Sequence, residues 1–354
     1  MPGGDVRRVP AHVDGAQAQR SSPRSSLHIS LDYVREIVLD AAYVESASFR
    51  KDAGIVLRAL PGMITTLLWG DEPAEYPPCV DVLNVRIDNI TMSEAIARIT
   101  AMLDGRKPRQ VCFINPHYIN ETFRVTEYKR VLDEAALVLA DGFGTRLAGK
   151  ILHRPIRQNL CGTDLFPRLC AALADGARSI YLLGAAPGAA ALVAAWVRER
   201  YPGVVIKGWH HGFFSIEEEE AVIQEIAQSG ADILIAAMGV PKQELWLHRH
   251  RQRLNVKVAI GFGGLFDCFA GRVPRAPQWV REIGMEWMYR LIQEPRRMWR
   301  RYLIGNALFL ARVLHQRLFP GVWALSTAER SQGIEKRGHG AAQCAVSADD
   351  GLTH

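Results

Sequence analysis

Residues 179–197 read SIYLLGAAPGAAALVAAWV, a stretch without charge whose length is close to the ~20 residues of a membrane-spanning helix. Gly184 and the Pro187-Gly188 pair interrupt it in the middle, and the residues before Gly184 form a short apolar run typical of a buried strand. We therefore interpret this stretch as a strand, a glycine-rich turn and an alanine-rich helix, not as a membrane span.

The same unit of strand, loop and helix recurs on both sides of this stretch. Short apolar runs, each followed by a loop and a helical segment, occur at 80–87, 110–116, 136–142, 204–210, 231–239 and 256–264. This alternation predicts an α/β fold with a Rossmann-like, doubly wound and mainly parallel sheet. In such a sheet, ligands bind at the carboxyl ends of the strands.

The composition changes at both ends of the α/β region. Residues 1–80 begin with an arm rich in Ser, Arg, Pro and Gly and end in an acidic linker, so we expect an N-terminal extension that is partly disordered. The main domain is expected at 81–284, followed by a helical basic appendage at 285–320 and a disordered tail at 321–354.

Positive charge is concentrated near the C-terminus. The net charge is +6, and the segment 272–317 alone holds ten Arg against three Glu, mixed with Trp, Met and Leu at helical spacing. This mixture favours peripheral attachment to an anionic membrane surface, because apolar groups enter the headgroup boundary while cations bind the lipids. The alternatives are core-packing helices with a basic face or a dimer interface, so a homo-oligomer stays open. No nucleic-acid partner is expected.

Cysteine spacing and the N-terminus indicate the cytoplasm. The six cysteines form no CxxC pair and no disulfide framework, and the first residues lack the continuous apolar stretch of a cleavable signal. We expect a cytoplasmic protein that lies peripherally on the inner face of the cytoplasmic membrane.

Asp141 is the strongest candidate for chemistry in the expected strand-end loops. It directly follows an apolar run and precedes Gly142, which would let a substrate approach, so its carboxylate is suited to act as a general base. The alternative is a helix cap or a turn aspartate. Asn115 and the loops 184–188 and 239–244 follow other predicted strands. The backbone N–H groups of the two Gly/Pro loops could bind a diphosphate, and the alternative is tight turns without a ligand.

Several cofactor motifs do not occur in the chain. It contains neither GxGxxG nor GxxxxGK[ST], the fingerprints of many dehydrogenases and of P-loop ATPases. It also has no DxD pair, and His248 and His250 would point to different faces of a helix. We therefore expect no cofactor and no metal.

Seven blocks of residues occur in an order that is similar to one known family. They are Asn115, 141–144, 162–165, 181–188, 239–244, 267–277 and 286–291. Through them the chain resembles the TagA/WecG/CpsF family, family 26 of the glycosyltransferases, over about residues 81–318.

The resemblance implies an inverting, metal-independent hexosyltransferase. It would move a hexose or N-acetylhexosamine from a UDP-sugar to a polyprenyl-diphosphate-linked sugar acceptor, in exopolysaccharide or cell-surface polysaccharide biosynthesis. It makes 81–284 the catalytic domain and Asp141 the base. The implied substrate-binding residues are Asn115, Gly184, Gln243, Asp267, Arg290, Arg297 and Arg300.

Two departures from the family pattern bear on activity. Phe113 stands where the family usually has Thr, and Asn159 stands where it usually has Arg. These changes keep a second hypothesis open, a catalytically impaired, membrane-associated protein that binds nucleotide-sugars. A nicotinamide-dependent oxidoreductase is a third, suggested by the fold alone. The residues do not specify the donor sugar.

Overall fold

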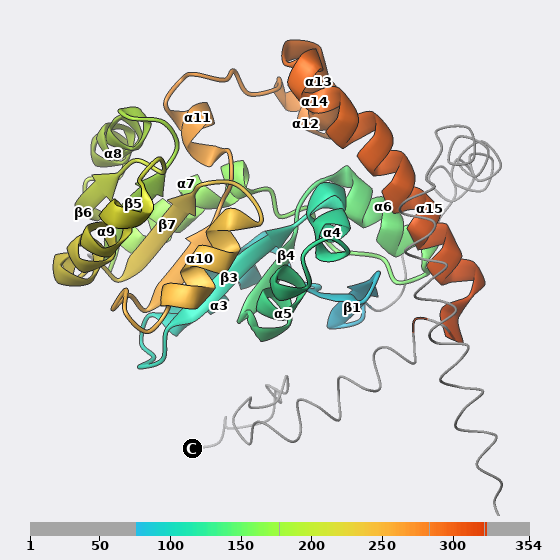
Figure 1. Ribbon diagram of the computed structural model, residues 1–354, viewed down its shortest axis with the longest axis horizontal. Helices are drawn as coiled ribbons and strands as arrows, with labels where there is room; N and C mark the ends of the chain where they lie inside the picture. The colour runs from blue at the N-terminus through green and yellow to red at the C-terminus, as the bar shows by residue number, and fades with distance from the viewer. Residues whose placement is uncertain (1–75, 177, 283, 322, 324–354) are drawn as a thin grey trace, which may run out of the picture. The chain divides into compact units, whose positions relative to one another are not determined.

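The computed structural model describes residues 76–176, 178–282, 284–321 and 323 (Figure 1). The predictions for residues 1–75 and for the tail from 324 lie outside the described residues. Among the residues that are described, no helix combines the length and apolarity needed to cross a membrane.

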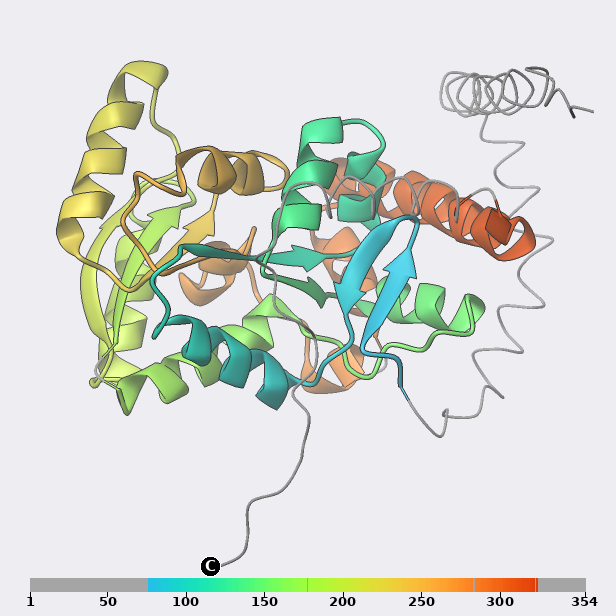
Figure 2. The same ribbon diagram turned by 90° about the horizontal axis from the view of Figure 1, so that it is seen from below.

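Eight strands form one sheet in the order β1-β2-β4-β3-β8-β7-β5-β6. β1 pairs with β2 in antiparallel fashion, and every other pair is parallel (Figure 2). The strands are β1 (Cys79–Val82), β2 (Val85–Asp88), β3 (Arg109–Ile114), β4 (Leu137–Ala140), β5 (Ser179–Gly184), β6 (Val205–His210), β7 (Ile233–Ala237) and β8 (Val258–Gly261). The predicted Rossmann-like, mainly parallel α/β fold is confirmed.

The order in which the chain adds strands to the sheet changes direction between β3 and β8. From β3 it passes to β4 on one side, and it builds β5 to β8 on the other side. β3 and β8 are therefore neighbours at a topological switch point, where open α/β sheets bind their ligands.

The opening unit around β5 forms as its sequence predicts. β5 ends at Gly184, and α8 (Ala189–Arg200) begins after a short loop. Gly184 has a φ of 144°, and an added Cβ would lie 2.4 Å from the carbonyl oxygen of Ala237 on β7. Glycine at position 184 therefore allows the loop to pass close to the neighbouring strand.

The prediction of one strand over 80–87 was wrong, because these residues form a hairpin. Leu83 and Asn84 have φ values of 51° and 63°, so the chain turns between β1 and β2. Successive positive φ values are typical of tight hairpin turns, but Leu is a rare residue at such a position. The composition therefore gave no signal for this turn.

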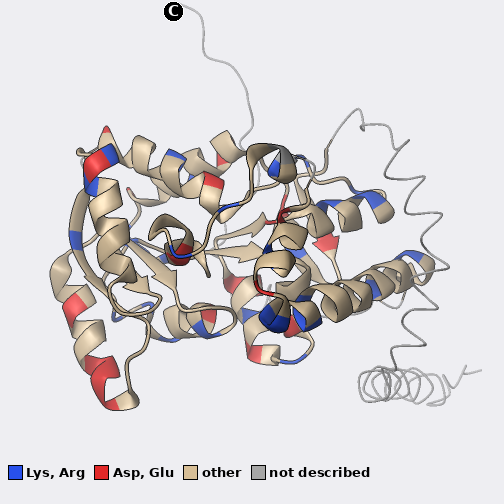
Figure 3. Ribbon diagram, turned by 90° about the horizontal axis from the view of Figure 1, so that it is seen from above, with Lys and Arg blue, Asp and Glu red and all other residues tan. Residues whose placement is uncertain are grey.

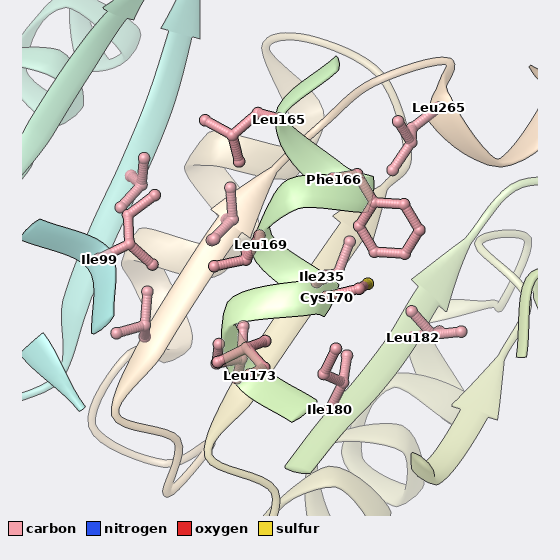
Figure 4. Close-up of a cluster of buried hydrophobic side chains, with 14 of the residues drawn as sticks. Ile99, Leu165, Phe166, Leu169, Cys170, Leu173, Ile180, Leu182, Ile235 and Leu265 are labelled. Carbon is pink, nitrogen blue, oxygen red and sulfur yellow. The ribbon is translucent and has the colours of Figure 1, made fainter. Parts of the chain in front are cut away.

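Helices cover both faces of the sheet. α3 (Met92–Met102), which begins with a capping box at Thr91, packs with α7 (Gly162–Ala174) and α8 on one face. Figure 4 shows α7 directing its apolar side chains toward Ile180, Leu182 and Ile235 of the strands. The opposite face carries α4 (Pro116–Thr122), α5 (Thr126–Glu134), α6 (Phe143–Ile151), α9 (Ile216–Ser229) and α10 (Lys242–His250).

A run of helices follows α11 (Leu265–Phe269) at the C-terminal end (Figure 1). They are α12 (Gln278–Glu282), α13 (Glu286–Gln293), α14 (Pro295–Trp299), the π-helix η1 (Arg300–Ile304) and α15 (Gly305–Leu318). α15 buries Phe309 and Val313 in the same apolar cluster as α4 and α6. The last helix is therefore part of the core as well as a carrier of arginines.

Candidate functional site

Asp141 lies at the carboxyl end of β4, next to the end of β3. Its backbone N–H donates to the carbonyl oxygen of Ile114 at 2.8 Å, which fixes the loop against β3. α6 begins at Phe143 with Gly142 as its N-cap and without a side-chain cap hydrogen bond, so the Asp141 carboxylate does not serve as the helix cap. Its carboxylate therefore stays available for chemistry.

Asn115 links the two strand ends. As the N-cap of α4, it accepts the Tyr118 N–H on Oδ1 at 3.1 Å, and its Nδ2 donates to Oδ2 of Asp141 at 3.4 Å. The same side chain therefore starts a helix and orients the Asp141 carboxylate. The sequence placed both residues at strand ends, and the parallel pairing of β3 with β4 brings them together.

Burial raises the pKa of Asp141 above its usual range. Hydrogen bonds from Asn115 and Cys161 and the positive charge of Arg301 act in the opposite direction, while the negative charge of Asp164 adds to the rise. A carboxylate with a raised pKa is a stronger base toward a hydroxyl proton, provided that it is still ionised at the working pH.

Gln243 lies beneath the strand-end loops and is fully buried. Its Oε1 accepts the N–H groups of Met238, Gly239 and Gly263 at 3.1 to 3.2 Å. Its Nε2 donates to Oε1 of Glu244 at 2.7 Å. The expected place for Gln243 was the pocket wall, whereas the observed contacts tie the end of β7 to the end of β8.

Glu244 is a buried carboxyl behind Gln243. Burial raises its pKa to about 8, although the hydrogen bond from Gln243 opposes the rise. At neutral pH this group is therefore mainly a neutral acid in the folded chain, and an ionised carboxylate in the unfolded chain.

We predict that the free energy of unfolding falls as pH rises from about 5 to 8, since the folded chain holds a proton that the unfolded chain has lost. The slope from this group is about 1.4 kcal/mol per pH unit. Glu244→Gln keeps the shape and removes the titration, so urea denaturation at pH 5 and pH 8 should show a smaller difference in the variant. Equal pH dependence in the two proteins would exclude this role.

Gly184 and Asp267 lie on elements that Arg272 connects. Asp267 is on α11, and its carbonyl oxygen accepts the backbone N–H of Arg272 at 2.9 Å. The Arg272 guanidinium in turn donates to the carbonyl oxygen of Pro187, in the loop after Gly184, at 2.9 Å. The loop after β5 is thereby held to the loop after α11.

The three arginines predicted to bind substrate occupy different environments. Arg290 reaches the loop after β8, because a Cβ added to Gly264 would lie 3.1 Å from its Nη2. Arg297 is exposed and pairs with Glu294 at 3.1 Å, and Arg300 is exposed over the ring of Trp299. Arg positions recur along these C-terminal helices (Figure 3).

Comparison with known proteins gives the family. The model of the glycosyl transferase WecG/TagA/CpsF family matches residues 80–321. The chain belongs to this family. It is therefore a glycosyltransferase of the WecG/TagA/CpsF type.

Three relatives share one name, N-acetylglucosaminyldiphosphoundecaprenol N-acetyl-beta-D-mannosaminyltransferase. The relative in Bacillus spizizenii strain W23 is 33% identical over 218 residues, 62% of this chain and 84% of the relative. The Bacillus subtilis strain 168 protein is 31% identical over 57% of this chain and 77% of its own length. The Staphylococcus aureus strain MRSA252 protein is 29% identical over 62% and 87%.

The two departures from the WecG/TagA/CpsF pattern have local explanations. Phe113 is buried, with its ring 5.0 Å from that of Phe262, so it fills an apolar space below the site. Asn159 accepts the Gly142 N–H on its Oδ1 at 2.6 Å and so supports the loop that carries Asp141. Phe113 therefore supports the site by packing, and Asn159 supports it through a hydrogen bond to the backbone.

Four residues that the sequence did not assign also lie near Asp141. Cys161 donates a hydrogen bond to its carboxylate, and Arg301 and Asp164 act on it through their charges. Burial, and then the charge of Asp141, raises the pKa of Glu286. Asp164 is neutralised by ion pairs with Arg275 and Arg281 at 2.6 and 3.2 Å. Asp164 and Glu286 lie within the family blocks 162–165 and 286–291 but received no role, and Cys161 and Arg301 lie outside those blocks. Helices far along the chain bring Arg301 and Glu286 to the site.

Proposed function

We propose that this chain transfers a hexose or N-acetylhexosamine from a UDP-sugar to a sugar on polyprenyl diphosphate, with inversion and without a metal. The observation that carries the proposal is the Asp141 carboxylate, held by Asn115 at the switch point of a WecG/TagA/CpsF family sheet. The acceptor class is supported by the relatives, whose name specifies N-acetylglucosaminyldiphosphoundecaprenol.

Single displacement at the sugar needs a base and a stabilised leaving group. In the proposed reaction, Asp141 takes the proton of the acceptor hydroxyl while that oxygen attacks the anomeric carbon and UDP departs. Arg290, Arg297 and Arg300 would bind the diphosphate, because the planar guanidinium pairs well with phosphate oxygens. The backbone after Gly184, which leads into α8, would bind the nucleotide together with Asp267.

Acceptor-dependent release of UDP separates the transferase from a protein that only binds nucleotide-sugars. The full chain is incubated in EDTA with UDP-glucose, UDP-N-acetylglucosamine or UDP-N-acetylmannosamine, with and without a short-chain N-acetylglucosaminyl-diphosphate lipid. We expect one donor to be consumed rapidly only when acceptor is present. Binding of a donor without turnover on any acceptor would favour the impaired protein, and activity that requires added manganese or magnesium would contradict the metal-independent mechanism.

We further propose that the C-terminal helices attach the enzyme peripherally to the cytoplasmic face of an anionic membrane. Ile292, Trp299 and Leu303 are 73%, 42% and 54% exposed, and they stand among the exposed Arg297 and Arg300. Exposed apolar groups beside arginines suit the boundary between headgroups and acyl chains. The polysaccharide pathway that uses the product is proposed to be one of exopolysaccharide or cell-surface polysaccharide.

Co-sedimentation with liposomes tests this attachment. Ile292→Ser with Leu303→Ser should weaken binding to anionic vesicles several-fold, and salt should weaken wild-type binding, since each basic residue contributes about 1 kcal/mol near an anionic surface. Phe213→Ser is the matched control, because Phe213 is 73% exposed but follows β6 at the far edge of the sheet. Unchanged binding of the double variant would contradict attachment through this face.

A further inference from the structure

The π-helix η1 separates two neighbouring arginines into different environments. Arg300 is exposed and lies 5.2 Å from the centre of the Trp299 ring. Arg301 is half-buried and lies 5.5 Å from the ring centres of both Tyr118 and Tyr302. π-helical turns change which side chains face a neighbouring element, and they are frequent at functional sites.

Packing fixes the position of Arg301 against α4. The Asn120 side chain donates to the carbonyl oxygen of Gly305 at 2.7 Å, at the point where η1 meets α15. Arg312 on α15 donates to the Oδ1 of the same asparagine at 2.7 Å. Within the described part of the chain, the buried Nε of Arg301 has no hydrogen-bond partner.

Tyr118 connects Arg301 to the proposed base. Its ring lies under the Arg301 guanidinium, and its backbone N–H donates to Asn115, which in turn donates to Asp141. An added Cβ on Gly263 would lie 3.0 Å from the Tyr118 hydroxyl, so the same ring also touches the loop after β8. Arg301 therefore faces the site from the C-terminal helices, behind the layer formed by Asn115 and Tyr118.

We propose that Arg301 is a positioning residue whose fixed positive charge keeps Asp141 ionised, in addition to any arginines that bind the diphosphate. The proposal rests on the proposed function of Asp141 as the base. A buried carboxylate loses its charge easily, and a nearby cation counteracts this loss without contacting the substrate.

Three of the other groups around Asp141 are neutral at pH 7, and Asp164 is paired. Burial raises the pKa of the Cys161 thiol and of the Tyr118 hydroxyl, and it lowers the pKa of His117 to about 4, so all three are neutral at pH 7. Burial, and then the charge of Asp141, raises the pKa of Glu286. Asp164 is paired with Arg275 and Arg281. The positive charge of Arg301 lowers the pKa of Asp141 directly.

The test is the pH profile of kcat/KM, measured on the full chain with a short-chain lipid acceptor in detergent. Loss of the cation in Arg301→Met should move the acidic limb of the profile upward by about one pH unit, with activity recovering at high pH to within a few-fold of wild type. Arg301→Lys keeps the positive charge, so its acidic limb should lie close to the wild-type pH. Arg296→Met removes an exposed arginine from the same helices and should leave the limb in place.

Two outcomes would overturn the proposal. An acidic limb that stays at the wild-type pH while Arg301→Met loses activity equally at every pH would make Arg301 a substrate-binding or purely structural residue. A shift that Arg301→Lys does not reduce would show that charge is not the cause. If Asp141→Asn is inactive and the acidic limb of Arg301→Met does not move, only the role of Arg301 is contradicted. If Asp141→Asn is active, Asp141 is not the base and the proposed function fails. Circular dichroism and melting temperature establish that each variant is folded.

Discussion

Asp141→Asn should reduce transfer by about two to four orders of magnitude, the range attributed to a general base. The amide keeps the size of the side chain but cannot take a proton from the acceptor hydroxyl. Because burial raises the pKa of Asp141, the charge is a cost to the folded state, so we expect the variant to be at least as stable as wild type. Loss of activity would then reflect chemistry, not unfolding.

Turnover, donor binding and thermal unfolding should be measured on the same preparation. Asp175→Asn is the control, since this substitution removes the same charge from an exposed aspartate at the end of α7. We expect donor binding of Asp141→Asn to stay within a few-fold of wild type. Transfer that remains within a few-fold of wild type would show that Asp141 is not the base.

Gln243→Leu should destabilise the protein by several kcal/mol and abolish transfer. Leucine fills a similar volume but accepts no hydrogen bond, so the N–H groups of Met238, Gly239 and Gly263 lose the acceptor they share. Each buried donor left unsatisfied costs about 1–3 kcal/mol. The ends of β7 and β8 would also lose the side chain that joins them.

Chemical denaturation checks this expectation. Gln224→Leu is the matched control, because Gln224 is exposed on α9 and its side chain donates to Glu220 on the same helix. That change should alter the free energy of unfolding by about 0.5 kcal/mol or less. A Gln243→Leu variant as stable as the control would mean that water or the backbone replaces the lost acceptor, and that Gln243 acts in another way.

The sequence predicted those features that depend on local pattern. Alternation of apolar runs with helices was sufficient to predict the α/β class. Because the carboxyl ends of parallel strands lie at the same edge of a sheet, Asn115 and Asp141 could both be predicted to lie at the site. Gly184 stood out because a charge-free stretch broken by glycine and proline is typical of a strand, a turn and a helix.

Features that depend on long-range packing were not predictable in the same way. The family resemblance implied that Gln243 binds substrate, which stays a prediction, and it did not indicate that three backbone donors surround the buried Gln243 side chain. Among the ten C-terminal arginines the family resemblance singled out Arg290, Arg297 and Arg300 but not Arg301, which the π-helix places in a different environment from Arg300. Amphipathic spacing in α15 did not reveal that Phe309 enters the core beside α4.

The configuration of the product tests the central claim most directly, that Asp141 activates the acceptor for a single displacement. The lipid product is made with the wild-type chain and an α-linked UDP-sugar that supports turnover, and the new glycosidic bond is assigned by NMR coupling constants. The account predicts a β-linked sugar on the lipid-linked acceptor. An α-linked product would require two displacements or a different mechanism, and would contradict the role given to Asp141.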